Sequence, residues 1–136
     1  MDNRITVGSS YEYEFSFNQE DVIKFAHASG DFNPIHLDEE YAKDSMFKRT
    51  IIHGFLGGSV FSKVFGTIFP GNGTIYLKQD LSFYKPMFTQ KQYKATFEVT
   101  ETDTTKNRAV VRTAILDDNN EIVIKGEALI KHPSIY

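Results

Sequence analysis

"GFLGGSVFSKVFGTIF", residues Gly54 to Phe69, is the stretch that decides the fold. Its bulky apolar side chains recur at helical spacing and cover more than one helix face, at Leu56, Val60, Phe61, Val64, Phe65 and Ile68. A helix that is apolar nearly all round is normally enclosed by other structure. The stretch is shorter than the roughly 20 residues of a membrane-spanning helix, and it contains a lysine. It therefore predicts one long helix that the rest of the chain buries.

Strand patterns lie on both sides of this helix. Before it, Tyr11 to Phe17 alternates aromatic with polar residues, which is typical of a half-buried strand. After it come alternating runs over residues 75–86, 93–99, 107–116 and 121–131. One antiparallel sheet of about five strands with helices on one side is an α+β domain, and such a sheet can wrap around the buried helix. Because the chain contains no linker or repeat, we predict a single domain over residues 1–136.

The composition excludes several classes of protein. The chain has 136 residues, of which 40% are apolar and 24% charged, and its net charge of −3 comes without a basic cluster, so nucleic acid is not an expected partner. There is no cysteine, which excludes disulfides and thiolate chemistry. The N-terminus lacks the apolar run of a signal peptide. We therefore predict a cytoplasmic protein with no membrane partner.

The segment "GDFNPIH", Gly30 to His36, carries an acid and a base close together. Gly30 is a helix stop signal, and Asn33 is pushed to extended backbone because it precedes Pro34. We therefore predict a stiff, non-helical loop on which Asp31 and His36 face one water molecule, as general acid–base catalysis requires. A helix exit with an Asx turn at Asn33 and a surface histidine is the competing interpretation.

The sequence "HGF" at the start of the buried helix is a second candidate site. Glycine at Gly54 lets a ligand approach the backbone closely, and the first amides of a helix are unpaired donors. Such donors suit the negative charge that develops on a carbonyl oxygen in a transition state. A tight helix entry is the alternative reason for Gly54. Ser59 and Ser62 need partners in this apolar helix, and their own backbone is the simplest one.

The stretch "FAHASGDFNPIHLDEEYA", Phe25 to Ala42, resembles the hydratase signature of the MaoC-like family, the (R)-specific enoyl-CoA hydratases. The stretches "IIHGFLGGSVFS" and "GTIYLKQDLSFYKPMF" resemble the same family in the same order. The resemblance implies a hotdog fold, in which a sheet wraps around one long helix, and a homodimer or a dimer of dimers. It implies reversible (R)-specific hydration of trans-2-enoyl-CoA to (R)-3-hydroxyacyl-CoA by a general acid–base pair. No cofactor and no metal are implied.

The resemblance also implies roles for five residues. The catalytic pair of the family falls on Asp31 and His36. The helix-entry amide that binds the thioester carbonyl falls on Gly54, and a serine placed near the aspartate falls on Ser62. The signature asparagine falls on Asn33, which is expected to shape the loop.

Two positions depart from the family pattern. Thr50 stands where proline is common before the "HG" step, and residues 88–93, "FTQKQY", lack a frequent Gly-Asp pair. Both lie outside the catalytic segment. They bear on substrate range and loop shape.

Other functions compete with hydration of an enoyl-CoA. A 3-hydroxyacyl dehydratase acting on acyl carrier protein, or a non-catalytic module that binds acyl thioesters, would use the same scaffold. His27, His53 and His36 with Asp31 offer a two-histidine, one-carboxylate metal site at irregular spacing. A Ser-His-Asp hydrolase would need Ser62, but "GGSVF" is not a G-x-S-x-G elbow.

Overall fold

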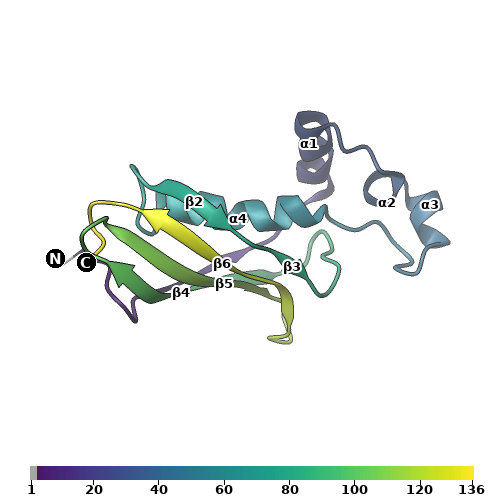
Figure 1. Ribbon diagram of the computed structural model, residues 1–136. Helices are drawn as coiled ribbons and strands as arrows, with labels where there is room; N and C mark the ends of the chain where they lie inside the picture. Colours follow the sequence, from purple (N-terminus) through teal and green to yellow (C-terminus); the bar gives the residue numbers. More distant parts are fainter. Residues whose placement is uncertain (1–2) are drawn as a thin grey trace.

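The computed structural model describes residues 3–136, which form an antiparallel sheet and four helices (Figure 1). The helices are α1 Gln19–Ser29, α2 Pro34–Leu37, α3 Glu39–Lys43 and α4 Gly54–Thr67. The strands are β1 Ser10–Phe15, β2 Ile75–Gln79, β3 Ser82–Phe83, β4 Tyr93–Asp103, β5 Arg108–Leu116 and β6 Ile122–Lys131. The predicted α+β class is confirmed.

The strands follow the order β1-β4-β5-β6-β2, and β3 also pairs with β6. The predicted strand over residues 75–86 is therefore two strands, which makes six strands among the described residues. The break falls at Asp80, whose backbone carbonyl lies so close to Gly126 of β6 that a side chain there has no room. Residues 80 and 81 thus separate β2 from β3, and both strands pair with β6.

Helix α4 packs against the sheet through aromatic side chains. The rings of Phe61 and Phe65 meet Phe97 of β4 with centroid distances of 5.7 and 5.2 Å, and Phe65 also meets Tyr76 of β2 at 5.2 Å. Each fully buried phenylalanine contributes about 1.5–3 kcal/mol. The predicted long helix is thus confirmed. No helix within residues 3–136 has the length and apolar character needed to cross a membrane.

The expectation that this helix is enclosed on all sides is wrong. Phe55 is 69% exposed, and Ser59 and Ser62 on the same side of α4 are exposed too. The sheet covers only the opposite face, which carries the buried residues Leu56, Gly57, Val60, Phe61, Val64 and Phe65. One stripe of α4 is therefore left exposed by residues 3–136.

Helices α1 to α3 stand to one side of the sheet, beyond the start of α4 (Figure 1). A capping box at Asn18 and Asp21 begins α1, and Gly30, with a φ of 80°, ends it. Helix α2 begins with Asn33 as its cap and Pro34 in its first turn. The prediction of a wholly non-helical segment is therefore wrong at His36, which lies in α2. Proline is well tolerated at the first helical position, because the amide that it lacks has no partner there.

Candidate active site

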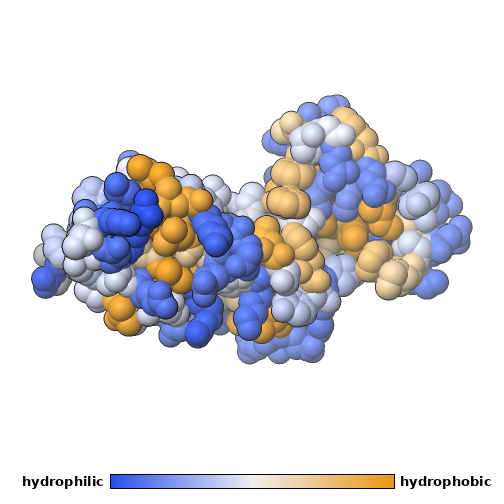
Figure 2. All heavy atoms as spheres, viewed as in Figure 1, coloured by the Kyte–Doolittle hydropathy of each residue, from blue (hydrophilic) through white to orange (hydrophobic). Residues whose placement is uncertain are grey.

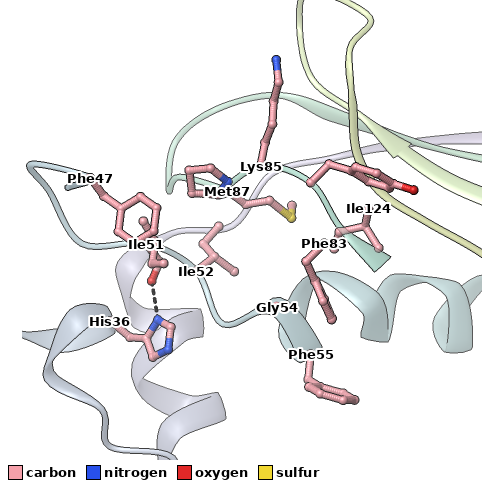
Figure 3. A pocket seen from close by; sticks show the side chains of 12 residues that line it. His36, Phe47, Ile51, Ile52, Gly54, Phe55, Phe83, Lys85, Met87 and Ile124 are labelled. Atoms are coloured by element: carbon pink, nitrogen blue, oxygen red, sulfur yellow. Dashed lines mark hydrogen bonds between the residues drawn. The ribbon is translucent and has the colours of Figure 1, made fainter. Parts of the chain in front are cut away.

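An apolar cavity of about 450 Å³ lies between the α1–α3 segment, the start of α4 and the sheet. Figure 2 shows orange, hydrophobic surface on both sides of the hollow between the two parts of the molecule. The lining residues are His36, Phe47, Ile51, Ile52, Gly54, Phe55, Phe83, Tyr84, Lys85, Pro86, Met87 and Ile124. Lys85 points away from the cavity (Figure 3) and pairs with Glu121 and Asp117. The cavity thus combines an apolar wall with one predicted catalytic residue.

His36 enters this cavity from α2 and is only 8% exposed, so the interpretation as a surface histidine is wrong. Its Nδ1 lies 2.8 Å from the Ile51 carbonyl oxygen (Figure 3). A carbonyl only accepts hydrogen bonds, so Nδ1 carries the proton and Nε2 of the neutral ring has a free lone pair. Burial lowers the pKa of His36 below its ordinary 6.5, against smaller opposite effects of the Ile51 bond and Asp31. His36 is therefore a neutral proton acceptor near pH 7.

Asp31 lies in the exposed turn between α1 and α2. Its backbone amide donates to the Ser29 hydroxyl at 3.1 Å, and its Oδ1 accepts from the Asn33 amide at 3.2 Å. Asn33 in turn accepts from the Ile35 amide at 3.1 Å, which is the Asx turn of the competing interpretation. The Asn33 side chain therefore caps α2, and its expected role in shaping the loop stays a prediction.

The carboxylate of Asp31 and the imidazole of His36 lie near each other. Asp31, His36 and His53 each offer one ligand atom, and these atoms all lie within 4.8 Å of one another. This is about the span of two hydrogen bonds that meet at one water molecule. The structure therefore brings together the acid and the base that the sequence singled out.

His53 is a neighbour of this pair that sequence reasoning considered only as a metal ligand. It is 2% exposed, its Nε2 donates to the Asp31 carbonyl oxygen at 3.0 Å, and its ring stacks on His36 at a centroid distance of 3.9 Å. Its only local signal is its place directly before Gly54. The contact between His53 and Asp31 joins residues 22 positions apart, and no local sequence pattern predicts it.

The same three residues are the donor set of a two-histidine, one-carboxylate metal site. His27, which the sequence analysis included, is outside the set and packs instead against Phe32 at a ring distance of 5.2 Å. One nitrogen of His36 and one of His53 already bind a backbone carbonyl, which leaves each ring a single nitrogen for a metal. The metal-free site stays a prediction.

Gly54 is the first residue of α4 and lines the cavity beside His36. An amide at this position has no partner inside the helix and lies at the positive end of the helix dipole. A Cβ on Gly54 would lie 2.7 Å from the ring of Phe83. Close approach of this ring accounts for glycine at this position, and the role of the Gly54 amide stays a prediction.

Ser62 does not line the cavity that His36 and Gly54 share. It lies eight residues after Gly54, about 12 Å along the helix axis, on the exposed stripe of α4. Ser59 bonds back to the Leu56 carbonyl at 2.6 Å, as predicted, whereas the Ser62 hydroxyl makes no hydrogen bond within residues 3–136. The role of Ser62 stays a prediction.

The unusual Thr50 has a structural role next to the site. It is buried, and both its hydroxyl and its amide donate to the Glu39 carboxylate at the start of α3. Proline has neither donor. Thr50, which departs from the family pattern, therefore connects α3 to the segment that leads into α4. In the segment 88–93, which is the second departure from the family pattern, the ring of Phe88 packs under the guanidinium of Arg49 at 4.4 Å.

An antiparallel sheet packed on one long helix, with an acid and a base at the helix start, defines a hotdog protein of the hydratase type. The family model described as MaoC like domain matches residues 2–120, and the chain belongs to this family. The chain is 39% identical over 129 residues to the (R)-specific enoyl-CoA hydratase of Aeromonas caviae, covering 95% of this chain and 96% of the relative.

Solved structures agree with this assignment. The A. caviae (R)-hydratase involved in PHA biosynthesis superposes with a TM-score of 0.91, covering 95% of this chain and 98% of that one at 39% identity. The unliganded R-hydratase of Pseudomonas aeruginosa gives a TM-score of 0.90 at 40% identity, covering 95% of this chain and 83% of that one. The expected hotdog fold is thereby confirmed.

Proposed function

We propose that this protein hydrates trans-2-enoyl-CoA thioesters to (R)-3-hydroxyacyl-CoA, and catalyses the reverse dehydration. The observation that carries the proposal is the free Nε2 lone pair of buried His36, next to Asp31 and to the start of α4. The names of the relatives from A. caviae and P. aeruginosa support the reaction and its stereochemistry. The name of the A. caviae enzyme also favours coenzyme A over acyl carrier protein as the carrier.

Water activation needs a base, because free water has a very high pKa and is a poor nucleophile. In the proposed mechanism one water molecule lies between the Asp31 carboxylate and His36 Nε2. His36 accepts a proton from this water while the water oxygen adds to carbon 3 of the enoyl group. The Asp31 carboxylate stabilises the imidazolium that forms.

Negative charge accumulates on the thioester carbonyl oxygen at the same time, and this oxygen needs a hydrogen-bond donor. The Gly54 amide, at the start of α4, is the proposed donor to this oxygen. The imidazolium of His36 then gives its proton to carbon 2, which restores the neutral ring. One water molecule is consumed, its hydroxyl ends on carbon 3 and a proton on carbon 2, so atoms and charges balance without a cofactor.

The direct test follows loss of the conjugated thioester when the protein is mixed with enoyl-CoA substrates of increasing chain length. We expect turnover and an (R)-3-hydroxy product on chiral analysis. Release of free thiol, detected with a thiol-reactive dye, would instead identify a hydrolase. Binding without turnover would favour the non-catalytic thioester-binding module.

The pH dependence of kcat/KM provides a second expected result. His36 must be neutral to accept a proton, and burial lowers its pKa from 6.5. Activity should therefore be level at neutral pH and fall only as the pH drops below 6.5 through the lowered pKa of His36. Initial rates from about pH 5 to about pH 8 measure this limb. An acid limb centred above 6.5 would contradict the assignment of His36 as the base.

We also infer that the protein is a homodimer, formed through the β2 edge and the exposed stripe of α4. β2 is an outer strand of the sheet, and Ile75 and Leu77 on it are 52% and 40% exposed. An apolar, unpaired edge readily pairs with a second chain. Phe55 adds an exposed aromatic side chain on α4. A dimer covers both surfaces at once.

Sedimentation velocity tests the dimer. We expect a particle of twice the chain mass, and we expect Leu77→Lys to shift it toward the monomer, because a lysine on a sheet edge opposes pairing. Val7→Lys is the matched control, since Val7 is 61% exposed outside this edge and should leave the mass unchanged. A monomeric wild-type protein would refute the dimer.

The single domain over residues 1–136 and the cytoplasmic location stay predictions.

A further inference from the structure

We propose that His53 is a positioning residue, which holds Asp31, His36 and the start of α4 in one arrangement through its hydrogen bond to the Asp31 backbone. The inference rests on the proposed roles of Asp31 and His36. It concerns a residue that neither contacts the acyl cavity nor belongs to the proposed acid–base pair.

His53 connects three parts of the site that lie apart in the sequence. Its Nε2 donates to the Asp31 carbonyl at 3.0 Å, and its ring stacks on His36 at 3.9 Å with an interplanar angle of 27°. Its own carbonyl accepts the first hydrogen bonds of α4, directly before Gly54. A shift of this one residue would therefore move the acid, the base and the helix-entry amide relative to one another.

The proton state of His53 follows from its contacts. Because a carbonyl accepts only, Nε2 carries a proton. Nδ1 is buried and has no hydrogen-bond partner within residues 3–136. The ring therefore serves as a hydrogen-bond donor to Asp31 through Nε2.

The ring of His53 also contacts the proposed base directly. It stacks on His36 at a centroid distance of 3.9 Å. Phe25 of α1 packs against His53 at a centroid distance of 4.8 Å. The contacts with Phe25 and His36 thus fix the orientation of the His53 ring.

Two substitutions separate the hydrogen bond from the ring. His53→Phe keeps an aromatic ring for the stack and removes the donor to Asp31, and we expect kcat to fall about 10–100-fold. KM should change by less than about threefold, because His53 does not line the acyl cavity. His53→Gln restores an N–H donor of similar reach, and we expect it to recover most of the lost kcat.

The controls distinguish positioning from a general loss of structure. His132→Phe is the matched control, since both nitrogens of His132 also make hydrogen bonds, to Ser134 and the Asn72 carbonyl, outside the site. It should keep wild-type kcat. Thermal midpoints of all three variants show whether they are folded.

Each outcome decides the inference. A folded His53→Phe protein with kcat within about twofold of wild type overturns it, as does a folded His53→Gln protein no better than His53→Phe. A wild-type protein that does not hydrate enoyl-CoA at all refutes the proposed function instead. The two failures are therefore distinguishable in one set of assays.

Discussion

Asp31→Asn and His36→Ala are each expected to reduce hydration of a short enoyl-CoA by about 10²–10⁴-fold, the usual contribution of general acid–base catalysis. The asparagine has nearly the shape of the aspartate, but it cannot stabilise the imidazolium by charge. The alanine removes the His36 Nε2 that accepts the proton in the proposed mechanism. Initial rates at saturating substrate measure both losses.

A matched control separates chemistry from folding. Asp38→Asn changes a carboxylate that caps α3 by accepting from the Tyr41 amide at 3.2 Å, and asparagine caps helices equally well. This variant should keep wild-type activity and stability. If a folded Asp31→Asn or His36→Ala protein turns over near the wild-type rate, the proposed acid–base pair is wrong.

Gly126→Ala is expected to destabilise the fold by more than about 3 kcal/mol, at the upper end of overpacking substitutions. A Cβ at this position of β6 would lie 1.8 Å from the Asp80 carbonyl oxygen. The carbonyl cannot retreat easily, because Asp80 and Glu127 exchange hydrogen bonds of 3.1 and 3.2 Å. Urea unfolding followed by circular dichroism measures the loss.

The neighbouring position provides the control for this variant. Lys125 in the same strand is exposed, so Lys125→Ala should change the free energy of unfolding by less than about 0.5 kcal/mol. A Gly126→Ala protein as stable as wild type would show that the segment joining β2 to β3 can move away from β6. Because β3 carries Phe83 to the cavity, such movement would also alter the site.

Local signals in the sequence predicted the secondary structure well. The stop signal at Gly30 ends α1 as expected, and alternation placed β1, β4, β5 and β6. These predictions hold because helix caps and strand alternation depend on residues only a few positions apart. The one-turn helix at Pro34 was missed, because proline signals both the end of a helix and the start of the next.

The sequence by itself determined the α+β fold, the long central helix and the acid and base on one segment. Only the tertiary structure decided what surrounds them. It buried His36 against the Ile51 carbonyl, placed His53 on Asp31, and kept Ser62 on an exposed stripe of α4. The physical reason is the sequence range of the interactions. The pattern of side chains along one helix or strand depends on neighbouring residues. The contacts that set proton positions join residues 15 and 22 positions apart, and they exist only after the elements pack.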